Sequence, residues 1–133
     1  MLRGVADTHA AIWYLFGDPR LSPAAKAFID RAAAEGNEIG LSSITLAEIV
    51  YLSEKRRIPG ETFTRFLAAL DLPDGVLTEI CFGRHVVEAM LQIDRTRVPD
   101  LPDRIIAATA VSRGVPLVTR DERIRVSGVT TVW

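Results

Sequence analysis

Short apolar runs alternate with longer helix-forming segments along the whole chain, and this alternation constrains the fold more than any other feature. Compact apolar runs bounded by turn residues predict strands at residues 2–7, 38–43, 76–80, 115–119 and 130–133. Helical spacing of apolar residues predicts helices at residues 8–16, 22–36, 44–57, 60–70, 83–94 and 100–114. Strands that are separated by helices pair through crossover connections, which build parallel sheets. We therefore expect an α/β fold with a mostly parallel, helix-covered sheet.

Length and composition indicate one domain, residues 1–133, because 133 residues with 48% apolar content fit a single core. No apolar run approaches the roughly 20 residues that span a bilayer. An acidic residue comes too early in MLRGVADTHA for a signal peptide, so we expect a cytoplasmic protein without a membrane segment. The lone Cys81 lies in an apolar setting and is predicted to be a small core residue.

The charge balance excludes a global positive field, since 16 basic and 17 acidic residues give a net charge of −1. Any nucleic-acid site must therefore be local. The run KRR at residues 55–57, with Arg120 and Arg123, could form a basic rim that contacts an RNA backbone. A run such as that at 55–57 is, however, more often a solvated helix end that favours the helix dipole.

The stretch VPDLPDRIIAATA (residues 98–110) places two acids at the entrance of a helix. Asp100 is a favoured N-cap residue and Pro102 suits the first helical turn. Asp103 could reach back to the cap in a capping box. Taken alone, this stretch needs no functional explanation.

Four acids, however, are expected to meet at one edge of the sheet. Asp7 ends the first strand, and Asp121 follows the strand at 115–119 with one residue between. Glu48 lies about one turn into the helix after the second strand, and Asp103 lies in the first turn of its helix. The functional crevice of such a sheet lies outside the carboxyl ends of its strands. Each acid alone could be a cap, a turn residue or a solvated side chain, but together they predict a shared crevice.

A carboxylate cluster of this kind needs a cation, because carboxylates within roughly 4 to 6 Å raise one another's pKa and destabilise the fold. Glu48 is the most informative member, since its apolar neighbours in LAEIV predict a helix that is buried on much of its surface. All-oxygen ligands suit Mg²⁺ or Mn²⁺, which can activate water for attack on a phosphodiester. The cluster therefore predicts a metal site for phosphoryl chemistry.

Other catalytic machinery is missing from the sequence. The chain has no GxSxG elbow, no GxxxxGKS/T loop, no GxGxxG and no HExxH motif. Two histidines are too few for a zinc site: His85 is expected at the surface, and His9 is expected to be a plain helix-start residue, although it lies close enough to Asp7 to touch the crevice. A phosphate-accepting receiver domain would need a lysine after a late strand, and the only lysines are Lys26 and Lys55.

At these positions the chain resembles the PIN-domain ribonucleases, and in particular the VapC-type toxins of bacterial toxin–antitoxin pairs. The resemblance extends over the whole chain and rests on four segments in the family's order, namely ADTHAAIWYL, LSSITLAEIV, PDLPDRIIAATA and LVTRDERIRVSGVTTVW. It implies a three-layer α/β/α sandwich and a nuclease dependent on Mg²⁺ or Mn²⁺ that cleaves RNA. It also implies a homodimer and a cognate antitoxin whose tail occupies the active-site groove.

The resemblance assigns roles to the acids. It implies that Asp7, Glu48 and Asp103 bind metal and that Asp121 completes the site, in some members through water. Asp100 is then left to helix capping and outer support of the site.

Three further side chains near the acids are assigned supporting positions. Ser43 and Thr119 match hydroxyl positions that can orient a carboxylate or a water, although either could simply be a polar residue that ends a strand. Arg104 could pair with Asp100 or reach a phosphate. A non-catalytic domain that binds RNA or a partner remains the alternative, and the sequence does not name the RNA.

Overall fold

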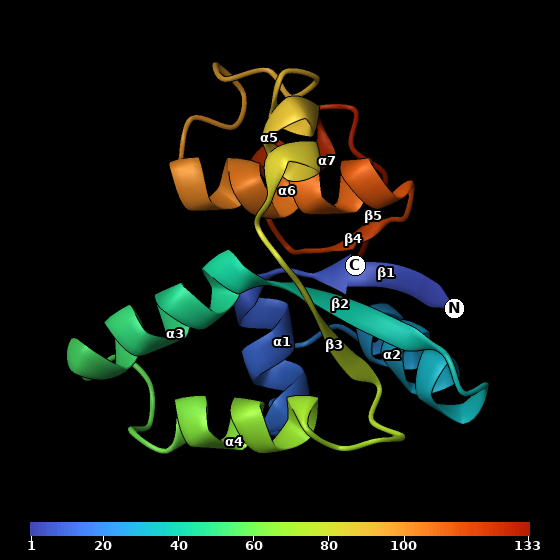
Figure 1. Cartoon of the computed structure of the whole chain (residues 1–133), viewed down its shortest axis with the longest axis vertical. Helices are drawn as coiled ribbons and strands as arrows, with labels where there is room; N and C mark the ends of the chain where they lie inside the picture. Colours follow the sequence, from blue (N-terminus) through green and yellow to red (C-terminus); the bar gives the residue numbers. More distant parts are fainter.

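The computed structural model describes all residues, 1–133, as one five-stranded sheet between two groups of helices (Figure 1). The strands are β1 (Leu2–Ala6), β2 (Glu38–Ser42), β3 (Leu77–Ile80), β4 (Leu117–Val118) and β5 (Thr131–Val132). The helices are α1 (Thr8–Leu15), α2 (Pro23–Ala34), α3 (Ser43–Glu54), α4 (Thr62–Leu70), α5 (Arg84–Met90), α6 (Leu101–Arg113) and α7 (Glu122–Arg125). The strand order is β3-β2-β1-β4-β5 and every pair is parallel, which confirms the predicted α/β fold.

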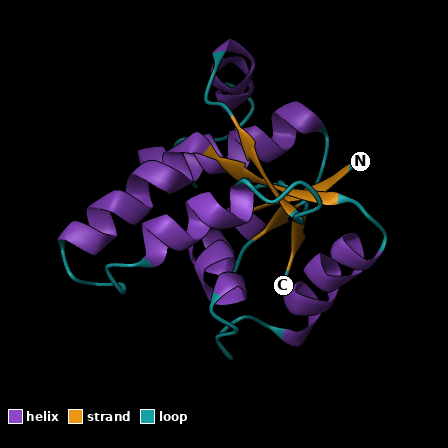
Figure 2. Cartoon of the chain, turned by 60° about the horizontal axis from the view of Figure 1, so that its bottom comes forward, coloured by secondary structure: helices purple, strands orange, loops and turns teal.

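The sheet is the middle of three layers. Helices α1 to α4 pack on one face, and α5 to α7 pack on the other (Figure 1), and Figure 2 shows the strands surrounded by helices. Successive strand residues alternate between the two layers, as the pleat requires. Val5 and Leu117 belong to the core beneath α5 and α6, whereas Ala6 and Val118 belong to the core beneath α1 and α2. The three-layer α/β/α sandwich is therefore confirmed. None of the helices combines the length and the apolarity that crossing a membrane requires.

Local signals in the sequence fix several helix boundaries. Ser22 caps α2 by accepting a hydrogen bond from the backbone N–H of Ala25 at 3.1 Å, and Pro23 opens that helix. Asp100 caps α6 in the same way, and Gly114 ends it in the left-handed conformation, with φ of 65°. These boundaries agree with the predicted ones to within one or two residues.

Other elements are shorter than predicted. The strand expected at 115–119 is reduced to two residues, because β4 pairs with β1 only opposite Val5 and Ala6. The helix expected at 83–94 ends at Met90, and the next residues form a turn in which Ile93 N–H donates to the Met90 carbonyl at 3.1 Å. Helix α7 has only four residues and was not predicted.

Two expectations about burial are wrong. Cys81 is exposed rather than a core residue, because it follows β3, the strand at the edge of the sheet. Helix α3 buries only Thr45 and Ile49 completely, while Val50 and Tyr51 are 38% and 57% exposed. Helix α3 extends away from the sheet beyond the carboxyl end of β2, so that only one stripe of its surface packs on the core (Figure 1).

The strand order places a topological switch point between β1 and β4. From β1 the chain builds outward to β2 and β3 on one side, and β4 and β5 then fill the other side. Loops that leave two such neighbouring strands diverge to opposite faces and open a crevice between them. Asp7 and the segment 119–121 stand directly at this point.

Candidate active site

A pocket of about 300 Å³ opens at the carboxyl ends of β1 and β4, and we call it the acid pocket. Its lining consists of Asp7, His9, Trp13, Asp103, Arg120 and Asp121. Three of the four predicted acids therefore share one pocket. The fourth, Glu48, lies nearby: after burial and the charges of Asp100 and Asp121, the negative charge of Glu48 also raises the pKa of Asp103.

Asp7 is fixed at the switch point by its backbone and its side chain. Its N–H donates to the Val118 carbonyl at 3.0 Å, which ties the end of β1 to β4. Its carboxylate caps α1 by accepting from the Ala10 N–H at 2.9 Å. Burial raises the pKa of Asp7, against the lowering effect of hydrogen bonds from Thr119 and Ala10. The fold therefore holds this carboxylate at some cost unless a cation offsets its charge.

Glu48 is held by two threonines that the sequence analysis did not single out. The hydroxyl of Thr8 donates to Glu48 Oε1 at 2.6 Å and lies 3.2 Å from the hydroxyl of Thr45. Both threonines are buried, and Thr45 lies three residues before Glu48 on the same face of α3. Burial raises the pKa of Glu48, the Thr8 hydrogen bond lowers it, and the nearby charge of Asp100 raises it. The sequence signal that could have identified this pair is the position of each threonine relative to an acid: Thr8 directly follows Asp7, and Thr45 lies one turn before Glu48.

Asp103 differs from Asp100 although both open α6. Asp100 is exposed and caps the helix by accepting from the Asp103 N–H at 3.1 Å. Asp103 does not return the bond, so no capping box forms and its carboxylate has no hydrogen bond. Burial, followed by the charges of Asp100 and Asp121, raises the pKa of Asp103 to about 7. Burial and like charges therefore destabilise the Asp103 carboxylate, and no hydrogen bond stabilises it.

Asp121 and Thr119 follow β4. Asp121 caps α7 by accepting from the Arg123 N–H at 2.9 Å, and the Arg123 guanidinium lies 3.6 Å from the same carboxylate. The Asp121 N–H in turn donates to the Thr119 hydroxyl at 3.0 Å. Thr119 is completely buried, and its hydroxyl lowers the pKa of Asp7. This one threonine thus links two of the acids, whereas a polar strand end would need no such contacts.

Ser43 and Arg104 lie differently. Ser43 donates to Glu79 at 2.7 Å, so it joins α3 to β3 and forms no hydrogen bond with any of the four acids. This placement fits the alternative of a polar residue at the end of a strand. Arg104 forms no ion pair with Asp100; it turns toward α5 and donates to the Met90 carbonyl at 2.8 Å, where a cation complements the helix C-terminus.

The remaining wall of the acid pocket is aromatic and basic. His9 is exposed and its ring packs on Trp13 with centroids 5.6 Å apart, so it is a helix-start residue that also lines the pocket. The guanidinium of Arg120 lies 4.7 Å from the Trp13 ring centroid. His85 is exposed, as expected, and Lys55 lies over Tyr51, away from this pocket.

The four acids have the ligand chemistry that a hard divalent cation prefers. All four offer oxygen donors, and the like charges around Asp103 raise its pKa. Their positions are not those of a closed ligand set, because no group of three His, Cys, Asp or Glu side chains comes close enough to hold an ion. The Asp103 carboxylate has no hydrogen bond that fixes its position.

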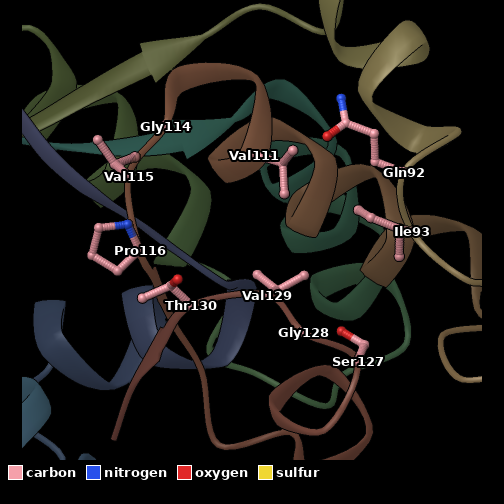
Figure 3. A pocket seen from close by; sticks show the side chains of 10 residues that line it. All are labelled: Gln92, Ile93, Val111, Gly114, Val115, Pro116, Ser127, Gly128, Val129 and Thr130. Carbon is pink, nitrogen blue, oxygen red and sulfur yellow. The ribbon is translucent and has the colours of Figure 1, made fainter.

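A larger cavity of about 410 Å³ lies at the other end of β4 and β5 (Figure 3). The side chains that line it include Gln92, Val111, Ser127, Val129 and Thr130. None of its ten lining residues is ionisable. This amino-edge cavity offers neither metal ligands nor an acid or base, so its size does not make it the better candidate.

Comparison with known proteins agrees with this geometry. The PIN domain family model matches residues 5–128. Ribonuclease VapC22 of Mycobacterium tuberculosis is 30% identical over 119 residues, which cover 90% of this chain and 87% of that protein. The chain therefore belongs to the PIN-domain family.

Solved structures show the same fold. VapBC2 from Rickettsia felis, bound to a DNA fragment from its promoter, superposes with a TM-score of 0.72 at 20% identity, covering 98% of this chain and 97% of that chain. DNA-bound VapBC from Salmonella typhimurium superposes with a TM-score of 0.71 at 24% identity, with the same coverage. These structures thus share the architecture over almost the whole length of the chain.

Proposed function

We propose that this protein is a metal-dependent endoribonuclease and the toxin of a VapBC-type toxin–antitoxin pair. The observation that supports this most directly is the gathering of Asp7, Asp103 and Asp121 in one pocket, with Glu48 beside it. The ribonuclease name of the 30% identical relative agrees with this chemistry. The VapBC complexes among the structural neighbours support an antitoxin as partner.

Each acid has a role in this proposal. Asp7, Glu48 and Asp103 bind Mg²⁺ or Mn²⁺, and Asp121 completes the site. A divalent ion bound there lowers the pKa of a water and stabilises the charge that develops on the phosphodiester. Thr8 holds the Glu48 carboxylate by its hydrogen bond, and Thr119 holds the backbone that carries Asp121. Both contacts keep the carboxylates oriented without neutralising them.

The remaining assignments complete the biological proposal. The protein acts in the cytoplasm and forms a homodimer, and the antitoxin keeps it inactive. A tail of the antitoxin that occupies the acid pocket would exclude RNA from it. The exposed apolar side chains Val50 and Tyr51, on the helix that carries Glu48, are available for contact with such partners.

A domain that binds RNA or a partner without cleaving it is the second candidate. The absence of a closed ligand set in the structure is the observation that favours it. Calorimetric titration with Mn²⁺ separates the two, because a binding scaffold has no need to take up the ion. Uptake that Asp7→Asn removes would support the nuclease, and no uptake would support the scaffold.

The decisive experiment compares Asp7→Asn with Asp74→Asn. Asparagine keeps the ability to cap α1, so the fold of the first variant should survive while its metal ligand is lost. Asp74 is exposed, lies before β3 and is outside the acid pocket, so its variant is a control of equal charge change. We expect Mg²⁺-dependent RNA cleavage by the wild type and by Asp74→Asn, and none by Asp7→Asn. Equal cleavage by both variants would defeat the assignment.

A further inference from the structure

A second pocket, of about 320 Å³, adjoins the acid pocket and shares His9 and Trp13 with it. We call it the arginine pocket, because Arg20 and Arg57 lie in its walls. Ile12, Phe16 and Ile58 make part of the lining apolar. A polymeric substrate that crosses the arginine pocket on its way to the acid pocket therefore contacts both cationic and apolar side chains.

Two arginines at these pockets have free guanidinium groups. Arg57 lines the arginine pocket and Arg120 lines the acid pocket, and neither side chain forms an ion pair or a hydrogen bond. Arg20 differs, because it binds Asp18 through two nitrogens, with Nη2 to Oδ2 at 2.7 Å. The Arg20 charge is thus neutralised within the protein, whereas Arg57 and Arg120 can each offer a whole donor fork.

Arg120 is the most unusual of these residues. It shares a pocket with Asp7, Asp103 and Asp121, yet it pairs with none of them. Instead, its guanidinium lies 4.7 Å from the centroid of the Trp13 ring, and the guanidinium of Arg20 also lies over that ring, at 5.1 Å. Trp13 is itself 3% exposed and fixed in the core. The stack therefore holds a cation beside the acids without cancelling their charge.

Single-stranded RNA offers the groups that this arrangement can bind. Its phosphates suit the flat fork of arginine, and its unstacked bases bind to aromatic rings and apolar surface. The exposed ring of His9 stands at the junction of the two pockets.

We propose that the arginine pocket binds the nucleotide that flanks the cleaved phosphodiester, with its base against His9 and the apolar wall and with its phosphates on Arg57 and Arg120. The inference rests on the proposed function, because it takes RNA to be the substrate. It makes Arg57 and Arg120 substrate-binding residues that act beside the acids. The test therefore uses single-stranded RNA, since a base within a duplex cannot enter the pocket.

The test measures RNA binding separately from cleavage. A short, labelled, single-stranded RNA of mixed sequence is titrated in EDTA with the wild type, Arg57→Ala, Arg120→Ala and Arg113→Ala. Arg113 is exposed at the opposite end of α6 from Asp103, so it controls for the change in net charge. We expect each of the first two variants to weaken binding about tenfold, as loss of a charge-assisted bond should. Each should also reduce the slope of log affinity against log salt by about 0.7.

Further measurements distinguish the loss of an arginine–RNA contact from a loss of the folded structure. Arg120→Lys keeps the charge but loses the fork, so its affinity should lie between those of the wild type and Arg120→Ala. With Mn²⁺ present, both alanine variants should raise KM and leave kcat unchanged. Thermal unfolding verifies the fold of each variant, and a duplex RNA should bind more weakly than the single strand.

The outcomes distinguish this inference from the function on which it rests. If the wild type cleaves RNA and both alanine variants bind it as Arg113→Ala does, the inference is overturned and the proposed function stands. If the wild type binds RNA through both arginines but never cleaves it, the pocket is supported and the nuclease is overturned. If the wild type neither binds nor cleaves RNA, both are overturned.

Discussion

The two ends of β4 carry cavities of opposite chemistry. At the carboxyl end, the acid pocket of about 300 Å³ contains three carboxylates. At the amino end, the cavity of about 410 Å³ contains no ionisable residue. The difference comes from what adjoins each end. Loops that leave the carboxyl ends lead into α1 and α7, whose N-terminal amides attract the capping acids Asp7 and Asp121. Placement relative to strand direction thus separates the two cavities by their chemistry, whereas volume does not.

Among variants that compare the two cavities, Asp103→Asn should have the largest effect on the rate of RNA cleavage. It should lower RNA cleavage by more than about 100-fold, beyond the loss that residues merely supporting a metal site usually cause. Asp100→Asn should stay within about tenfold of the wild type, because asparagine still caps α6. Gln92→Ala, in the amino-edge cavity, should leave the rate unchanged. Steady-state cleavage assays measure all three, and a Gln92→Ala rate as low as that of Asp103→Asn would erase the contrast between the two edges.

Stabilisation by manganese should also be confined to the carboxyl edge. An ion that binds only the folded state stabilises it by about 2.7 kcal/mol at a concentration 100 times the dissociation constant. Mn²⁺ should therefore raise the Tm of the wild type and of Gln92→Ala at pH 7.5, and it should leave the Tm of Asp103→Asn unchanged. Differential scanning fluorimetry with and without EDTA tests this. An equal rise in all three proteins would place the ion elsewhere.

Thr119 at the carboxyl edge of the sheet and Thr130 at the amino edge allow the same substitution to be compared in the two cavities. Thr119 is buried between Asp7 and Asp121, whereas Thr130 is exposed in the amino-edge cavity and its hydroxyl makes no hydrogen bond. Thr119→Val should lower cleavage about tenfold, as for other partners of metal ligands. Thr130→Val should have no measurable effect. Assays of kcat with saturating Mn²⁺ distinguish the two, and identical rates would mean that the Thr119 hydroxyl serves only stability.

The smallest expected effect is a pH dependence of stability in the absence of metal. The pKa of Asp103 rises from 3.8 to about 7 on folding, so the native state binds more protons than the unfolded state between these values. The contribution of this group to the free energy of unfolding therefore falls as the pH rises from about 4 to about 7 and is at its lowest above pH 7. Urea titrations in EDTA should show this fall in the difference between the wild type and Asp103→Asn. A difference that does not change with pH would contradict the burial of this charge.

Much of the candidate site followed from local sequence. The positions of Asp7 and Asp121 after apolar runs, and of Asp103 in a capped first turn, sufficed to bring three acids to one edge. The division between Asp100 and Asp103 also followed, since a capping residue must stand just before the helix. The assignment of these acids to metal binding stays a prediction.

The sequence by itself determined the alternation of strands and helices, and hence a parallel sheet with acids at its carboxyl edge, because periodicity, capping and turn chemistry are local. Only the tertiary structure decided which strands are neighbours, and therefore that β1 and β4 flank the switch point. It alone turned Arg104 toward α5, exposed Cys81 and brought Thr8 to Glu48, 40 residues away. These outcomes depend on packing between segments distant in the chain, and no pattern within one segment contains that information.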